Sequence, residues 1–265
     1  MDNLYPEFEG YSPAEMHMIL YSTFEESSPI QLQKLSEVEY NKIPIFLQVR
    51  HIAQTLLKDG EIRLTAVGNL PMNIVAELYP LGVSDWFIES GKSKYIREQD
   101  SLSVQLARIL IEQMGVAKKR NNVLSLTKAG AKIFSDYSVL LPLLMETFGR
   151  RFNWAYFDAF GENNIGQLGF GFSLDLIGKY GSVRRADKFY ADKYFAAFPM
   201  LLEGLVPSFG TLGEYATSCY SIRTFDRFLL QLGLVEIEEE KNPDGEKTIV
   251  KTEIFDKLFK FVQHN

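Results

Sequence analysis

Lys118-Lys119-Arg120 is a run of three cations that directly precedes the turn-forming pair Asn121-Asn122. Long cationic side chains on a protruding hairpin are suited to contacts with the phosphates of a nucleic acid. The helix expected before this hairpin offers two further polar side chains to a groove of the nucleic acid. A lysine follows the hairpin. The candidate nucleic-acid-binding residues are therefore Gln105, Arg108, Lys118, Lys119, Arg120 and Lys128.

The charge distribution singles out the same part of the chain. Residues 92–134 contain nine cations and three anions, whereas residues 211–265 contain seven cations and ten anions. The formal net charge of the whole chain is −6, which disfavours nucleic-acid binding over the whole surface. A local basic patch is compatible with this balance, because patches rather than averages bind nucleic acid.

A second row of polar residues is less suited to nucleic acid. Arg223, Arg227 and Gln231 recur at helical spacing and are expected on one face of a helix. The hairpin expected after them carries Glu236 and Glu238–Glu240, whose negative charge would repel a duplex. The candidate interface is therefore placed before residue 135.

No arrangement of residues predicts catalysis or metal binding. His17, His51 and His264 stand alone, and no serine lies in a G-x-S-x-G turn. The single Cys219 is expected to be buried as a small apolar residue, and Gly169–Gly171 to form a close helix contact or a turn. We expect no catalytic residues, no metal and no cofactor, and hence a protein that is not an enzyme.

The basic hairpin belongs to a segment that occurs twice. Ser103–Gly115 aligns with Ser221–Gly233 without a gap. After each glycine come two β-prone runs separated by a turn, and each copy closes on T-x-x-x-x-K-[IL]-F, at Thr127–Phe134 and Thr252–Phe259. Helix, two-stranded wing and closing helix is the order of a winged helix-turn-helix, so the chain is expected to contain two such units.

Turn signals place the strands of both hairpins. Val116–Lys119 and Val123–Leu126 are expected to pair around Asn121-Asn122. The second hairpin is expected within Leu234–Lys251, with its turn at Asn242–Gly245. The predicted fold is mainly α with short β-hairpins (α+β): tandem winged helix-turn-helix-like units joined by a helical, aromatic-rich middle.

Composition divides the chain into four expected segments. The first is an acidic arm with eight carboxylates and one lysine before residue 40, in which Ser12–Glu15 predicts the start of a helix. This arm either packs on the first unit or masks a basic surface. The expected segments are the N-terminal arm (1–40), the first winged-helix-like unit (41–135), a helical connector (136–180) and the second winged-helix-like unit (181–265).

The expected location is the cytoplasm, with no membrane partner. The N-terminal residues lack the basic-then-apolar order of a signal peptide. The longest apolar runs, such as Val139–Met145, are too short to cross a bilayer.

Three segments resemble a family of uncharacterised bacterial proteins: Ser12–Tyr21 (SPAEMHMILY), Leu64–Pro71 (LTAVGNLP) and Leu124–Gly130 (LSLTKAG). The last, continued to Phe134, also resembles the wing and closing helix of bacterial winged-helix regulators. The resemblance spans much of residues 10–135 and fades in the second half of the chain. It implies winged-helix-like units but no established activity, and it assigns no functional residue.

Two hypotheses about function remain. The first is a cytoplasmic protein that binds nucleic acid, DNA or RNA, through the basic wing of the first unit. The second is a protein–protein interaction module that uses winged-helix folds as a scaffold, without catalysis. The aromatic middle and the acidic second unit favour the second hypothesis. Salt-dependent binding to duplex DNA, single strands and RNA distinguishes the two.

Overall fold

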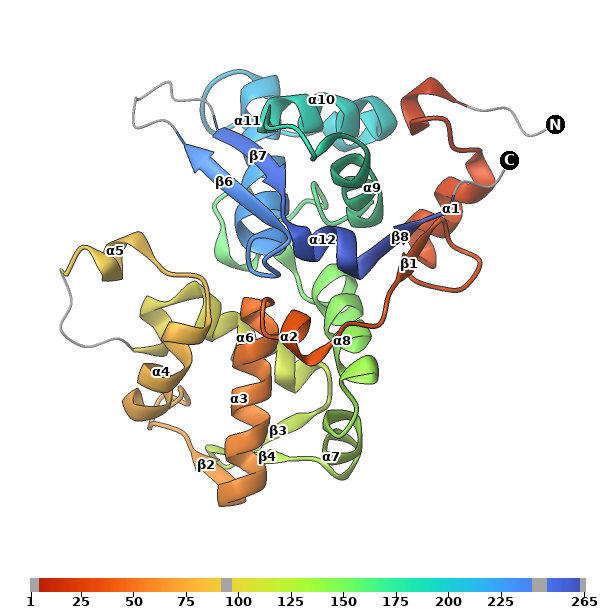
Figure 1. Ribbon diagram of the computed structural model, residues 1–265. Helices are drawn as coiled ribbons and strands as arrows, with labels where there is room; N and C mark the ends of the chain where they lie inside the picture. Colours follow the sequence, from red (N-terminus) through yellow and green to blue (C-terminus); the bar gives the residue numbers. More distant parts are fainter. Residues whose placement is uncertain (1–4, 92–96, 240–246, 263–265) are drawn as a thin grey trace. The chain divides into compact units, whose positions relative to one another are not determined.

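The computed structural model describes residues 5–91, 97–239 and 247–262 (Figure 1). Helices account for most of the regular structure, and the strands form small antiparallel sheets. Some features expected from the sequence lie outside the described residues: Lys92, Lys94, Glu240, the turn at Asn242–Gly245, and His264.

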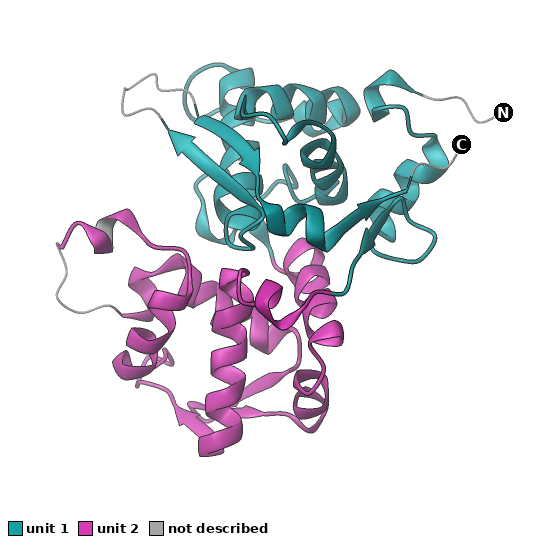
Figure 2. Cartoon of the chain, in the orientation of Figure 1, with its two compact units in different colours: residues 1–34, 153–265 teal, residues 35–152 magenta. Residues whose placement is uncertain are grey.

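The chain forms two compact units, shown in separate colours in Figure 2. Unit 1 consists of residues 1–34 and 153–265, and unit 2 consists of residues 35–152. This division differs from the four expected segments, because the arm (1–40) and the connector (136–180) are each divided between the units. Unit 2 contains the first sequence repeat and unit 1 contains the second.

Unit 2 is a helical unit with one three-stranded antiparallel sheet, in the order β2-β4-β3. Short 3₁₀ turns occur at Tyr79–Leu81 and Glu98–Asp100. Its helices and strands are α2 (Glu37–Tyr40), α3 (Pro44–Asp59), β2 (Glu61–Arg63), α4 (Met72–Leu78), α5 (Trp86–Glu89), α6 (Leu102–Gln113), β3 (Ala117–Arg120), β4 (Val123–Leu126), α7 (Lys128–Phe134) and α8 (Tyr137–Glu146).

The predicted basic hairpin is confirmed as β3 and β4, with β3 one residue later than expected. Asn121 and Asn122 have φ values of 52° and 56°, the left-handed conformation that a two-residue hairpin turn requires. Thr127 then begins α7, and its hydroxyl accepts a hydrogen bond from the Gly130 backbone N–H at 2.7 Å. Any side chain at position 130 would collide with the Val116 backbone, so the LTKAG segment needs its glycine.

Packing of α3 against α6 forms the core of unit 2. Both helices carry an apolar stripe at helical spacing, which becomes the buried face. Rings from three elements extend this core: Tyr40 stacks on Phe46 at 5.1 Å between ring centroids, and Tyr137 meets both edge-on. The strands of the sheet pack directly on α3 and α6.

Unit 1 contains a second three-stranded sheet, in the order β5-β7-β6, and a separate pair, β1-β8. Short 3₁₀ turns occur at Pro6–Phe8, Trp154–Phe157 and Pro199–Leu202. Its helices and strands are α1 (Pro13–Tyr21), β1 (Ile30–Leu32), α9 (Phe170–Tyr180), β5 (Arg185–Ala186), α10 (Asp187–Ala197), α11 (Leu212–Ser221), β6 (Val235–Glu239), β7 (Lys247–Lys251), α12 (Glu253–Leu258) and β8 (Phe259–Phe261).

The same order of elements occurs in both units. Apart from α5 and the 3₁₀ and π segments, a helix, a short strand, two further helices, a hairpin and a closing helix occur in the order α3-β2-α4-α6-β3-β4-α7 in unit 2 and α9-β5-α10-α11-β6-β7-α12 in unit 1. In each sheet the short first strand pairs with the second strand of the hairpin. The two sequence repeats therefore lie at equivalent positions of two similarly connected units.

Two features of unit 1 differ from what local helical spacing indicates. α11 continues directly into a π-helical segment, Ile222–Leu229, with no turn between them. The basic segment Arg184–Tyr194, which helical spacing alone predicts to be one helix, begins instead with a strand, because Arg185–Ala186 pairs with β7 as strand β5. Pairing with a strand more than sixty residues later is a long-range interaction that local helical spacing cannot indicate.

Antiparallel pairing of β1 with β8 joins the N-terminal residues to the end of the chain. The predicted capping box at Ser12–Glu15 is confirmed, and it begins α1, which buries Met16 and Ile19. Gly169 precedes α9 with φ 73°, and a side chain at Gly171 would meet the Ile19 carbonyl. The expected close helix contact at this glycine pair is thus confirmed, and the part of the arm up to residue 34 belongs to unit 1.

Candidate nucleic-acid interface

The β3–β4 hairpin of unit 2 presents its cations on two different faces. Side chains alternate along a strand, so Lys118 and Arg120 point to one side of the sheet and Lys119 to the other. Ala117, on the same side as Lys119, is 2 % exposed and packs on the core. Lys118 and Arg120 therefore lie on the outer face.

Strand register adds a third cation to this outer face. Val123 of β4 pairs with Arg120 of β3 on one side and with Arg63 of β2 on the other. The side chains of Arg63, Val123 and Arg120 therefore form one row across the outer face, which Lys118 shares. We call Arg63, Lys118 and Arg120 the basic face. Arg63 is 85 % exposed in its side chain and lies 3.4 Å from Glu61, whereas among the described residues no ion pair involves Lys118 or Arg120.

Lys119 makes an internal contact instead. Its ammonium donates a hydrogen bond to the Gly68 carbonyl oxygen at 3.3 Å, and its charge interacts with the Glu98 carboxylate. Lys119 therefore attaches the hairpin to the loop before α4. The three consecutive cations of the sequence do not form a single surface.

The two candidate residues on α6 are held by partners within unit 2. Arg108 is only 11 % exposed and lies 3.1 Å from Glu112 and 3.6 Å from Glu98. The Gln105 amide donates to the backbone carbonyls of Gln99 and Ser101 at 3.2 and 3.5 Å. Base contacts by either side chain would require these interactions to break.

Glu98 organises this arrangement, and the sequence did not indicate its role. Its carboxylate accepts a hydrogen bond from the Leu70 backbone N–H at 2.5 Å and faces Arg108. Burial raises the pKa of the Glu98 carboxyl above its ordinary value. The residue thus connects the loop before α4 to α6.

Lys128 lies at the start of α7, at the opposite end of β4 from the Asn121-Asn122 turn, and is exposed. The structure thus brings together Lys118 and Arg120 from the candidate list and adds Arg63. Lys128 is exposed but is separated from them along the hairpin. Arg63 was missed because its position depends on which strand β2 pairs with.

The equivalent helix of unit 1 presents no comparable row. Arg223 is fully buried and forms a bidentate ion pair with Asp158, with Nε–Oδ2 at 2.6 Å. Its remaining N–H groups donate to the backbone of Gly161, Asn163 and Ile165. Arginine with all its donors satisfied inside the unit has none left for a base or phosphate.

Burial also removes the other two members of that row. Gln231 is 4 % exposed, and burial lowers the pKa of the Arg227 guanidinium. Arg223, Arg227 and Gln231 therefore do not offer an exposed polar row to a nucleic acid, because Arg223 and Gln231 are buried and Arg227 is half-buried.

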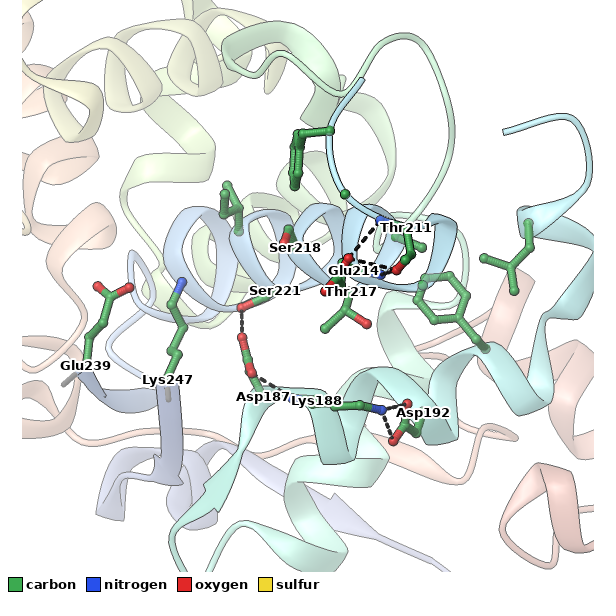
Figure 3. Close-up of a pocket in the computed structure, with 17 residues that line it drawn as sticks. Asp187, Lys188, Asp192, Thr211, Glu214, Thr217, Ser218, Ser221, Glu239 and Lys247 are labelled. Carbon is green, nitrogen blue, oxygen red and sulfur yellow. Dashed lines mark hydrogen bonds and ion pairs between the residues drawn. The ribbon is translucent and has the colours of Figure 1, made fainter. Parts of the chain in front are cut away.

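A groove of about 1110 Å³ lies between α10 and α11 of unit 1 (Figure 3). Phe195, Leu202 and Phe209 supply its apolar surface, and Phe209 is 50 % exposed. Ser221 and Glu214 of α11 line one side; the labelled sticks show Ser221 hydrogen-bonded to Asp187 of α10 and Glu214 turned back to Thr211. The sequence did not indicate this groove, because its walls meet only when the two helices pack.

Carboxylates outnumber cations around the groove. The acids are Asp187, Asp192, Glu214 and Glu239, and the cations are Lys188 and Lys247. Lys188 pairs with Asp192 at 2.6 Å, and Lys247 pairs at 2.7 Å with a further acid, Asp226. The rim of the groove is therefore negatively charged.

Nothing in the described part of the chain forms an evident reaction centre. Cys219 is buried as expected, and burial raises the pKa of its thiol to about 12, so thiolate is scarce at neutral pH. His51 lies 2.9 Å from Glu77 in an ion-pair arrangement on the helical surface. The described residues contain no group of three histidine, cysteine or acidic side chains placed to hold a metal ion.

Comparison of the chain with models of protein families, with curated proteins and with solved structures finds no match. Across the residues that the structure describes, no helix combines the length and apolar character needed to span a bilayer. The proposals about function therefore depend on the geometry of the two units.

Proposed function

We propose that this protein binds nucleic acid through the basic face of unit 2, formed by Arg63, Lys118 and Arg120. The observation that carries the proposal is the strand register, which aligns three exposed cations on one side of the sheet. The element order of unit 2 and its strand order β2-β4-β3 support a winged helix-turn-helix assignment. In such a fold the hairpin contacts the nucleic-acid backbone.

The proposed binding is to the backbone and has low sequence specificity. Phosphate contacts carry no base identity, and the α6 side chains that would contact bases are Gln105 and Arg108, both occupied internally. The same geometry supports the tandem assignment, in which unit 1 repeats the connectivity but buries Arg223. Binding rather than catalysis is the proposed activity.

The test is a salt titration of binding to a fluorescent duplex, with single-stranded DNA and duplex RNA as parallel probes. Replacing Arg63, Lys118 and Arg120 with alanine removes about three phosphate contacts, which should lower the slope of log K against log salt by about 2.7 for a DNA duplex. Sequence preference should not change. Absence of binding by the wild-type chain at low salt would refute the proposal.

The matched control removes the same charge from unit 1. Lys188, Lys257 and Lys260 are exposed cations of that unit, outside the basic face. Their triple alanine variant should keep the wild-type salt slope. An equal loss in both triple variants would show that net charge, and not the basic face, sets the affinity.

A second candidate function, protein binding, is favoured by the groove of unit 1. Its apolar surface and acidic rim are complementary to a basic amphipathic helix of a partner protein. A leucine–lysine amphipathic peptide should bind, and a leucine–glutamate peptide of the same length should not. Phe209→Ser should weaken binding of the first peptide, whereas Val183→Ser, at an exposed valine outside the groove, should not.

A further inference from the structure

Residues 5–11 form a closed hook at the start of unit 1. The Gly10 backbone N–H donates to the Tyr5 carbonyl oxygen at 3.1 Å, and the Tyr5 N–H donates to the Tyr11 carbonyl oxygen at 3.4 Å. A 3₁₀ turn at Pro6–Phe8 fills the bend. These bonds leave the side chain of Glu9 at the end of the turn.

Glu9 has a strained backbone conformation. Its φ of 56° lies in the left-handed region, which is unfavourable for a residue with a side chain because Cβ crowds the following carbonyl oxygen. The turn itself does not require a glutamate at position 9, because glycine adopts this backbone conformation without strain. Contacts of the Glu9 side chain must therefore offset the strain.

Three side chains of α9 and α10 contact Glu9, two of them at its carboxylate and one at its backbone carbonyl. The Lys193 ammonium lies 2.7 Å from Glu9 Oε1, and the Tyr180 hydroxyl donates to Oε2 at 2.5 Å. The Lys179 ammonium donates to the Glu9 backbone carbonyl oxygen at 3.0 Å. We call Lys179, Tyr180 and Lys193 the cradle.

Aromatic rings and burial strengthen the cradle. The Lys193 ammonium lies 4.7 Å from the centre of the Tyr180 ring and 5.4 Å from that of Phe189, distances typical of cation–π contacts. The Glu9 side chain is only 11 % exposed and that of Lys193 is 29 % exposed. The hydrogen bond from Tyr180 to this carboxylate raises the pKa of the Tyr180 hydroxyl.

The pattern of contacts is specific to a peptide. Lys193 and Tyr180 each bind one oxygen of the carboxylate, while Lys179 binds the main-chain carbonyl of the same residue. A phosphate would offer no main-chain carbonyl to Lys179. The charge of Lys179 is already matched by Asp175, at 2.9 Å.

We propose that the cradle is a recognition site for a glutamate-containing peptide of a partner protein, and that the hook occupies it within the same chain. The acidic arm then masks basic residues of its own unit. An incoming acidic peptide displaces Glu9, and release of the left-handed glutamate favours the exchange. This site is separate from the basic face of unit 2 and does not depend on nucleic-acid binding.

The experiment uses the full-length chain and a fluorescent peptide with the hook sequence YPEFEGYS. Glu9→Ala removes the carboxylate bound by Lys193 and Tyr180 and leaves only the main-chain contact of Lys179 to hold the hook in the cradle. The peptide should therefore displace the hook and bind this variant at least about tenfold more tightly than the wild type, the effect of one charge-assisted hydrogen bond. Adding Lys193→Ala to Glu9→Ala should abolish binding. Adding Lys188→Ala, on the same helix but outside the cradle, should not.

Competition identifies the ligand class. Hexaglutamate should displace the labelled peptide, whereas hexaglutamine, inorganic phosphate and a DNA duplex should not. The peptide YPEFQGYS should bind weakly.

Displacement by phosphate or duplex at equal concentration would overturn the proposal in favour of a phosphate site. Equal binding by wild type and Glu9→Ala, or no binding by either, would also overturn it. Glu9→Gln, which keeps the shape of the side chain, replaces Glu9→Ala if that variant unfolds.

Discussion

The hydroxyls of Thr127 and Thr252 make the same hydrogen bond in the two units. Thr127 donates to the Gly115 carbonyl oxygen at 2.7 Å, and Thr252 donates to the Gly233 carbonyl oxygen at 2.7 Å. Both glycines are left-handed, with φ values of 71° and 67°. Each threonine thus connects the end of a hairpin to the glycine that begins it, which explains why the repeat contains both residues.

We predict that Thr127→Val destabilises unit 2 more than Thr252→Val destabilises unit 1. Thr127 also accepts the Gly130 N–H as a helix cap, whereas Thr252 makes no side-chain cap. The expected losses are about 2 kcal/mol and about 1 kcal/mol, respectively. Urea-dependent amide hydrogen exchange measures them, read from the backbone amides of each unit separately. Equal losses would mean that the helix cap contributes nothing.

The ion pair of Arg223 with Asp158 should contribute far more to stability than an exposed pair of the same length. Asp158→Ala leaves a buried guanidinium without its carboxylate, which should cost about 3 to 5 kcal/mol. Lys188 and Asp192 are also 2.6 Å apart but more than 60 % exposed, so Asp192→Ala should cost less than about 1 kcal/mol. Chemical denaturation of the two variants and the wild type measures the two losses in unfolding free energy. Similar losses would contradict the assigned burial.

Cys219 should make the chain less stable in alkali. Its thiol has an ordinary pKa of 9.0 and a folded-state pKa of about 12, so the unfolded state loses its proton first. The contribution to stability is complete below pH 9 and is lost as pH rises toward 12, at up to about 1.4 kcal/mol per pH unit. The difference in unfolding free energy between wild type and Cys219→Ala should be constant from pH 6 to 8 and shrink above pH 9. A pH-independent difference would show that the thiol is not shielded in the folded state.

Lys118 and Lys119 should behave differently although they are adjacent. Lys118→Ala removes an outer-face cation and should lower the salt slope of duplex binding by about 0.9. Lys119→Ala should leave the slope unchanged and weaken the attachment of the hairpin to the loop at Gly68, seen as faster amide hydrogen exchange there. Identical salt slopes for the two variants would indicate that both lysines contact phosphate.

Local chemistry was enough to predict several elements. The Asn121-Asn122 turn and the capping box at Ser12 each depend on residues within a few positions of one another. The buried state of Cys219 followed from its apolar neighbours. These features were confirmed because their stabilising interactions close within one turn or one hairpin.

Local chemistry could not predict which strands pair. This applies to β2 with β4, to β5 with β7 and to β1 with β8. Arg63 joins Lys118 and Arg120 only because β2 aligns with β4, about sixty residues later in the chain. Glu9 meets Lys193 across more than 180 residues. Such contacts depend on how helices pack, and no local spacing encodes them.

The sequence by itself thus determined the repeated order of helix, hairpin and closing helix, because turn residues, caps and hydrophobic period act over short distances. Only the tertiary structure decided which charges are exposed. Arg223 and Lys118 are both cations of the repeated segments, yet Arg223 is enclosed by Asp158 and backbone carbonyls while Lys118 lies on an outer strand face. Burial of a charge requires partners that converge from distant segments, and that convergence is a property of the folded chain.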